Sequence, residues 1–149
     1  MMALSGDSRT MDPSLPPVPH RPPMLLIDRV RAADATRCST VTRVDPGAWY
    51  ADADGAMPGW FGLELMAQSV AAFSGSRGRE LGTAPKFGYL LGTRQYTCAV
   101  PAFPAGAELE VRVEVEYADA MGLSAFTCEL SSAGAVLARA VLTVYEAES

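Results

Sequence analysis

One apolar segment near the middle of the chain restricts the folds open to this sequence more than any other feature. Pro58 and Gly59 open a predicted helix that runs from Trp60 to about Ser76. Its apolar residues lie nearly all round the helix: Trp60, Phe61, Leu63, Leu65, Met66, Ala67, Val70, Ala71 and Phe73. A helix that is hydrophobic on every side has to be buried. We therefore expect this helix at the centre of the fold.

Segments typical of β-strands precede and follow this helix. The most regular runs from Glu108 to Tyr117, where apolar and charged residues alternate as in a strand with one wet face. Further strands are predicted at residues 24–30, 37–44, 87–98, 123–130 and 136–145. Only a curled sheet covers so much apolar helix surface. We predict an α+β fold in which a long antiparallel sheet wraps around one central helix, at about residues 60–76.

Length and composition set the domain organisation. With 149 residues, of which 49% are hydrophobic, the chain has the size of one globular domain. Residues 1–18 are rich in Pro, Ser and Asp and read as a flexible leader, so residues 19–149 form the expected domain. The sequence has no apolar stretch long enough for a membrane span and no signal-peptide pattern at its start. We expect a cytoplasmic protein.

Charge and cysteine content exclude several kinds of site. The net charge of -5 argues against a nucleic-acid partner, because phosphate binding needs a basic surface. The three cysteines, Cys38, Cys98 and Cys128, are odd in number and lack partners at metal-ligand spacing. Neither a disulfide framework nor a metal site is therefore predicted.

Glu64 is the ionisable side chain that stands out within the apolar helix, and Gln68 follows it one turn later. Burying an unpaired carboxylate is costly, so Glu64 either has hydrogen-bond partners or lies at a cavity that a ligand reaches. A structural acid paired with Gln68 or an arginine is the alternative to a functional one. The position near the helix start favours function, because free amides there suit a carbonyl oxygen that gains negative charge. Gly59 would let a ligand approach that backbone closely.

Four segments carry a resemblance to a known family. Residues 57–68, Met-Pro-Gly-Trp-Phe-Gly-Leu-Glu-Leu-Met-Ala-Gln, resemble the central-helix motif of β-hydroxyacyl-acyl carrier protein dehydratases. Residues 19–30, Pro-His-Arg-Pro-Pro-Met-Leu-Leu-Ile-Asp-Arg-Val, are similar to the first-strand signature of that family. Gly92-Thr93-Arg94 and Pro104-Ala105-Gly106 fit its later strand and turn. The resemblance spans about residues 19–146 and is strongest to the small dehydratase branch of aryl-polyene pigment clusters.

The resemblance implies a hot-dog dimer, either a homodimer or a heterodimer with a second hot-dog subunit, that dehydrates a 3-hydroxyacyl thioester on an acyl carrier protein. The product would be the trans-2-enoyl thioester, in polyene or fatty-acid-like synthesis, and no cofactor is needed. Glu64 would protonate the departing hydroxyl, the amide of Gly59 would bind the thioester carbonyl, and Gln68 would orient Glu64. Trp60 and Phe61 are candidates for lining the substrate tunnel, together with Trp49, Tyr50 and Phe73.

The general base departs from the family pattern. A loop histidine is expected before the helix, but the spacing back from Glu64 arrives at Tyr50, and a phenol is a poor base near neutral pH. The single histidine of the chain, His20, lies in the first-strand signature, where a structural role is the simpler interpretation. A partner chain supplies the base, or His20 folds into the site, or the chain has lost dehydration and only binds acyl groups. Because the family's loop histidine and helix acid come from opposite subunits, we predict a shared site in which Glu64 faces a partner's histidine.

Two other functions remain open from the sequence. In a hot-dog thioesterase, Glu64 would activate water against the thioester, and the product would be a free acid. In a non-catalytic partner subunit, the chain would only shape an acyl tunnel, which the missing loop histidine allows.

Overall fold

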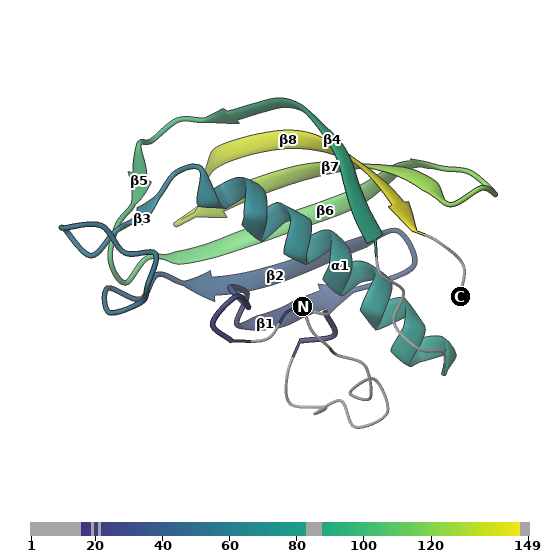
Figure 1. Cartoon of the computed structure of the whole chain (residues 1–149), viewed down its shortest axis with the longest axis horizontal. Coiled ribbons are helices and arrows are strands. Elements are labelled where there is room, and N and C mark those ends of the chain that lie inside the picture. Colours follow the sequence, from purple (N-terminus) through teal and green to yellow (C-terminus); the bar gives the residue numbers. More distant parts are fainter. Residues whose placement is uncertain (1–15, 19, 21, 83–87, 147–149) are drawn as a thin grey trace.

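Six antiparallel strands form the main sheet of this computed structural model, which describes residues 16–18, 20, 22–82 and 88–146. The strands lie in the order β1-β2-β6-β7-β8-β4, and a small second sheet pairs β3 with β5 (Figure 1). Their bounds are β1 Arg29–Ala33, β2 Arg37–Arg43, β3 Met57–Pro58, β4 Gly88–Cys98, β5 Ala102–Phe103, β6 Glu108–Ala118, β7 Leu123–Ser132 and β8 Ala135–Glu146. The predicted antiparallel sheet is confirmed. Phe87, with which the strand predicted at residues 87–98 began, lies outside the described residues.

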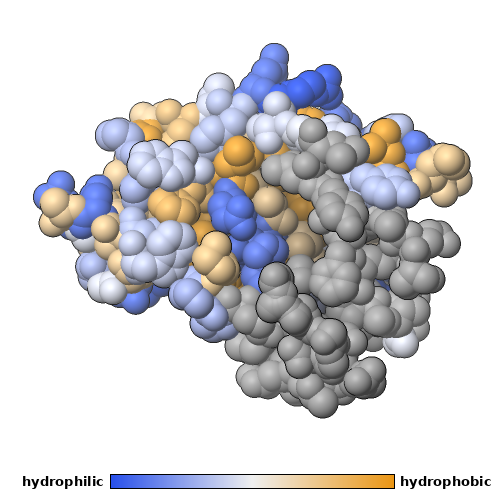
Figure 2. All heavy atoms as spheres, in the orientation of Figure 1, coloured by the Kyte–Doolittle hydropathy of each residue, from blue (hydrophilic) through white to orange (hydrophobic). Residues whose placement is uncertain are grey.

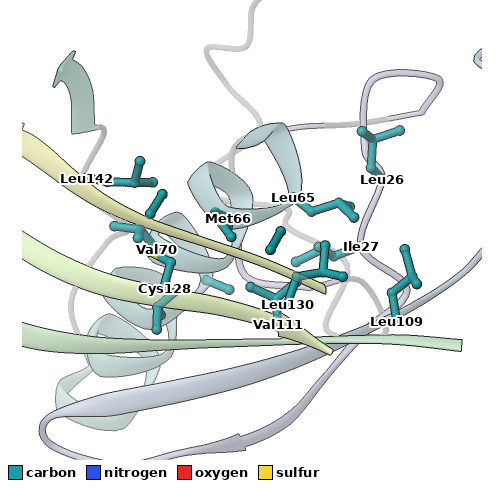
Figure 3. Packing of buried hydrophobic residues seen from close by; sticks show 14 of the residues in the cluster. Leu26, Ile27, Leu65, Met66, Val70, Leu109, Val111, Cys128, Leu130 and Leu142 are labelled. Atoms are coloured by element: carbon teal, nitrogen blue, oxygen red, sulfur yellow. The ribbon is translucent and has the colours of Figure 1, made fainter. Parts of the chain in front are cut away.

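One long helix, α1 (Phe61–Leu81), crosses the concave side of this sheet (Figure 1). Leu65, Met66 and Val70 point from the helix towards strand residues such as Val111 and Leu130, all within one buried cluster (Figure 3). The alternation predicted for β6 is confirmed, because its apolar residues Leu109, Val111 and Val113 are fully buried against α1 and its neighbours. The central helix and the sheet that curls over it are therefore as the sequence predicted.

The helix extends about five residues beyond its predicted end at Ser76. The loop around Gly78, Gly82 and Pro85 was expected to end it, but Gly78 lies within the helix. Termination comes at Gly82, whose φ of +73° is the left-handed conformation that commonly follows the last helical turn.

The first strand begins later than predicted. Met24 belongs to a turn, residues 25–28 lie outside any strand, and β1 starts at Arg29. The reason is a side chain: Gln68 of α1 accepts a hydrogen bond from the amide of Leu26 and donates one to the carbonyl of Met24. These backbone groups are thus satisfied by the helix and need no neighbouring strand.

The expectation that α1 is buried on every side is wrong for this single chain. The sheet covers the face that carries Leu65 and Met66, but Leu63, Ala67 and Ala71 are only half-buried. At the helix start Trp60 is 70% exposed. Figure 2, in the same orientation, shows hydrophobic residues at the surface on the side where the helix lies. One face of the helix therefore remains open for a ligand or a second subunit.

The packed part of the chain begins before residue 19. Pro16, Pro17 and Val18 are buried, and Val18 belongs to the hydrophobic core with no exposed surface. The leader predicted at residues 1–18 is thus too long by at least these three residues, while residues 1–15 lie outside the described part. No helix in the described part of the chain has the length and hydrophobicity to cross a membrane.

Candidate active site

The first turn of α1 brings an acid and the histidine together. Glu64 Oε2 lies 3.7 Å from Nε2 of His20, although 44 residues separate them in sequence. The side chain of His20 is 28% exposed and that of Glu64 is 44% exposed, so both are partly covered and yet reachable from solvent. Glu64 therefore sits at the surface of a hollow and is not buried in the core.

Gln68 fixes the Glu64 carboxylate from one turn further along α1. Its Nε2 donates a hydrogen bond to Glu64 Oε2 at 3.0 Å, while Gln68 itself is fully buried. The same side chain is held by the backbone of Met24 at 2.8 Å and of Leu26 at 2.9 Å. A side chain held at both ends cannot rotate freely, so it gives Glu64 a defined orientation. The predicted contact between Gln68 and Glu64 is confirmed as a hydrogen bond.

The segment that follows His20 is attached to the rest of the fold at several points. Besides the contacts with Gln68, the carbonyl of Leu26 accepts a hydrogen bond from Thr42 on β2. The indole of Trp49 donates one to the carbonyl of Pro23 at 2.8 Å. These contacts hold the backbone after His20 against both the helix and the loop before it.

Gly59 at the start of the helix is engaged in a way that the sequence did not indicate. Its amide donates to the carbonyl of Pro101 at 2.8 Å, and its carbonyl accepts from the hydroxyl of Tyr96 at 2.6 Å. A Cβ at this position would meet the carbonyl oxygens of Val100 and Pro101 at 2.9 and 3.1 Å. Close packing against the connection between β4 and β5 thus explains this glycine without a ligand. The Tyr96 contact was missed because no local pattern links residues 37 apart.

An apolar hollow of about 340 Å³ opens beside Glu64. It is lined by Met24, Leu26, Trp49, Trp60, Phe61, Leu63 and Glu64. Trp60 stacks on Phe61 with ring centroids 5.8 Å apart, and Trp49 meets Phe61 edge-on at 5.6 Å. Trp60 and Phe61, which the sequence proposed as lining residues of a substrate tunnel, thus line this hollow. Phe73 does not, because it packs against Phe126 on the sheet side of the helix.

Comparison with known protein families shows to which family the chain belongs. The ApeP-like family profile, described as ApeP dehydratase, matches residues 15–149. The chain belongs to the ApeP-like dehydratase family. Among solved structures, the dehydratase heterocomplex ApeI:P from Xenorhabdus doucetiae is 30% identical, with 90% of each chain covered and a TM-score of 0.83. Among curated proteins, none matches the sequence.

More distant structures share the fold alone. The TT0310 protein from Thermus thermophilus is 19% identical over 79% of this chain and 90% of its own, with a TM-score of 0.61. A hypothetical thioesterase protein with coenzyme A from Streptococcus pneumoniae is 13% identical over 80% and 88%, with a TM-score of 0.64. With these neighbours, the helix within a six-stranded sheet is the hot-dog fold that the sequence predicted.

Tyr50, to which the spacing back from Glu64 pointed as the position of the base, is held by other contacts in the fold. Its hydroxyl accepts a hydrogen bond from the amide of Asp45 at 2.9 Å, and its ring packs against Phe61. Burial raises the pKa of Tyr50 above its ordinary value, which keeps the phenol protonated. Of the two candidates for the base, the fold brings His20 to Glu64 and directs the hydroxyl of Tyr50 to Asp45.

The described residues contain no cluster of three or more side chains that would hold a metal ion. Cys38 and Cys128 are buried free thiols, and burial raises the pKa of each to about 12. Thiols with such pKa values stay protonated and unreactive. The chemistry that the site offers is proton transfer between a carboxyl, an imidazole and a bound molecule.

Proposed function

We propose that this chain dehydrates a 3-hydroxyacyl thioester carried on an acyl carrier protein, giving the trans-2-enoyl thioester in polyene or fatty-acid-like synthesis in the cytoplasm. The observation that carries the proposal is the pair of His20 Nε2 and Glu64 Oε2, 3.7 Å apart beside an apolar hollow. Two groups that exchange protons, placed together at the rim of such a hollow, suit the removal of water from an acyl chain. Membership of a dehydratase family supports the same reaction class.

His20 is the base and Glu64 the acid in this proposal. Neutral His20 takes the proton from the α-carbon, and the electron pair of that C–H bond forms the double bond to the β-carbon. The bond from the β-carbon to the hydroxyl oxygen breaks as Glu64 gives its proton to that oxygen, and water leaves. Imidazole suits the first step because its charge changes near neutral pH. The hydrogen bond from Gln68 orients the Glu64 carboxyl for the second step.

The thioester carbonyl is bound at the start of α1. The amide of Gly59 donates to Pro101, so that amide would have to exchange partners to take the role expected from the sequence. The next two amides are those of Trp60, just before α1, and of Phe61, its first residue, where N–H groups have no partner within the helix. We assign the carbonyl to these amides, with the acyl chain in the hollow between Trp49 and Trp60.

A second hot-dog subunit completes the active unit. The related chain from Xenorhabdus doucetiae comes from a dehydratase heterocomplex, ApeI:P. In this chain Trp60 and Met24 are 70% and 56% exposed beside the hollow, and a hot-dog partner would cover such apolar surface. The partner shapes the acyl tunnel, while His20 makes a histidine from that partner unnecessary for the base.

Product analysis tests this proposal and separates it from the alternatives. The purified chain, alone and with its hot-dog partner, is incubated with a 3-hydroxyacyl-carrier substrate, and the acyl group is followed by mass spectrometry. Loss of one water from the acyl group, abolished by His20→Ala in this chain, is the expected result. Release of free acid would indicate a thioesterase. Full activity of a complex that carries His20→Ala would mean that the partner supplies the base.

A further inference from the structure

The segment before His20 lies against the second half of α1. Pro16, Pro17 and Val18 are buried there, and the amide of Val18 donates to the carbonyl of Pro16 at 2.8 Å. Val18 is fully buried within the hydrophobic core, only two residues before His20. The chain that leads to the proposed base is therefore anchored in the core.

Gly75 is the point of the helix on which this segment rests. A Cβ built on Gly75 would overlap the carbonyl oxygen of Pro17 and would lie 2.9 Å from the Cβ of Pro17. Glycine is among the poorest helix formers and alanine the best, so a glycine inside a 21-residue helix needs a reason. The close approach of the Pro17 backbone provides that reason, because a residue with any side chain at position 75 would displace the segment.

The distances along the helix agree with this anchoring. Gly75 follows Glu64 by eleven residues, which corresponds to about 16 Å of helix. Three residues of chain can span at most about 10 Å, and the side chains of His20 and Glu64 can bridge what remains. The segment thus leads from Gly75 back towards the start of α1, where His20 meets Glu64.

We propose that Gly75 is a positioning residue, which seats Pro16–Val18 on α1 and thereby holds His20 beside Glu64. Gln68 holds the chain on the other side of His20 through Met24 and Leu26. His20 is then fixed from both directions, although it lies outside every strand and helix. The expectation that a change at Gly75 slows dehydration rests on the proposed function. The expectation that such a change moves His20 away from Glu64 does not.

Gly75→Ala in the full chain tests the proposal through the only histidine that the sequence contains. With histidine labelled in this chain alone, NMR gives one imidazole titration curve, assigned to His20. A carboxylate nearby favours the protonated imidazole, so Glu64→Gln should move the titration midpoint to lower pH by about half a unit or more. Gly75→Ala should move it in the same direction, because His20 leaves Glu64. Gly47→Ala, whose added methyl meets only an ordinary contact with Asp45 at 3.5 Å, is the matched control and should leave it unchanged.

Turnover is measured on the same variants. If both proposals hold, Gly75→Ala lowers the rate of dehydration at least about tenfold, as expected when a general base is misplaced. A shifted midpoint with normal turnover supports the role of Gly75 in positioning His20 and contradicts the role of His20 as base. An unchanged midpoint in Gly75→Ala shows that Gly75 does not position His20 and overturns the proposal. If Gly75→Ala folds poorly, Val18→Ser is used in its place, because it weakens the burial of the segment without changing a residue of α1. It should shift the His20 midpoint in the same direction. An unchanged midpoint in Val18→Ser overturns the proposal as well.

Discussion

Gln68 Nε2 donates to Glu64 Oε2 at 3.0 Å, and Gln68 Oε1 accepts from the amide of Leu26 at 2.9 Å. One buried amide side chain thus joins the candidate acid to the segment that follows His20. Removing it would disturb stability and catalysis together, because the backbone of Met24 and Leu26 depends on the same group.

Gln68→Leu is therefore expected to lower the free energy of unfolding by at least about 1–3 kcal/mol, since it leaves buried backbone groups without a partner. Urea denaturation measures this change. Ser74→Ala, at a half-buried position of the same helix, is the control and should change stability by less than about 0.5 kcal/mol. Equal stabilities of Gln68→Leu and wild type would show that the segment at 24–27 does not depend on Gln68.

Tyr96→Phe should destabilise the start of α1. The variant loses the 2.6 Å hydrogen bond to the carbonyl of Gly59, which is worth about 1 kcal/mol. Burial raises the pKa of Tyr96 well above its ordinary value, so the hydroxyl remains a donor throughout the neutral range. Thermal and urea unfolding of Tyr96→Phe, compared with wild type at pH 7, provide the measurement, and unchanged stability would argue against this contact.

Gly62→Ala should have a different effect on stability in the wild-type chain than in the Tyr96→Phe variant. A Cβ on Gly62 would overlap the hydroxyl oxygen of Tyr96, whereas the next nearest atom, Cζ of the same ring, is 3.4 Å away. We expect Gly62→Ala to destabilise the wild-type chain and to cost much less in Tyr96→Phe. Unfolding free energies of the two single variants and the double variant test this coupling, and strictly additive values would contradict it.

Trp60→Ala should weaken substrate binding with little effect on folding. The side chain is 70% exposed, so its loss should change the unfolding free energy by less than about 0.5 kcal/mol. Because Trp60 lines the hollow beside Glu64, the KM for acyl-carrier substrates should rise, more for long acyl chains than for short ones. Steady-state kinetics over a series of chain lengths measures the effect. An equal KM for all lengths would place the acyl chain elsewhere.

Alkaline pH should destabilise the fold through its buried thiols. Burial raises the pKa of Cys38 and of Cys128 from 9.0 to about 12, so the folded state holds these protons more tightly than the unfolded state. Their contribution to stability is complete below pH 9 and is lost as the pH rises from 9 towards 12. The double variant Cys38→Ala, Cys128→Ala should lose less stability over this range than wild type, measured by urea unfolding at several pH values. If the unfolding free energies of the double variant and of wild type fell equally with pH, the buried thiols would not be the cause of the loss.

The sequence predicted the elements whose signals are local. The alternation of β6 and the apolar run of α1 appear in the structure because burial against one neighbour follows directly from each pattern. The late end of α1 was missed because Gly78 was expected to belong to the loop after the helix, whereas it lies within α1. At Gly75, which the predicted helix included, a close contact with Pro17 accounts for the glycine. Local sequence cannot show a contact between residues so far apart.

The same limit applies to the site. Glu64 and Gln68 were found because they lie one turn apart on a single helix, and their hydrogen bond follows from that spacing. The place of His20 depends on an anchor at Gly75 and on the contacts of Gln68 with residues 24–27, none of which has a sequence signature. The sequence therefore favoured a partner's histidine, while the fold brings His20 of the same chain to Glu64.

Turnover of the Glu64→Gln variant, in complex with the hot-dog partner, shows whether Glu64 is the acid of the reaction. Glutamine keeps the shape of the side chain but has no proton to give to the departing hydroxyl, so dehydration of a 3-hydroxyacyl-carrier substrate should fall by about 10²–10⁴-fold. Circular dichroism and unfolding curves close to wild type would show that the loss concerns chemistry and not folding. Near-normal turnover by Glu64→Gln would mean that another group protonates the departing hydroxyl and that Glu64 is not the acid.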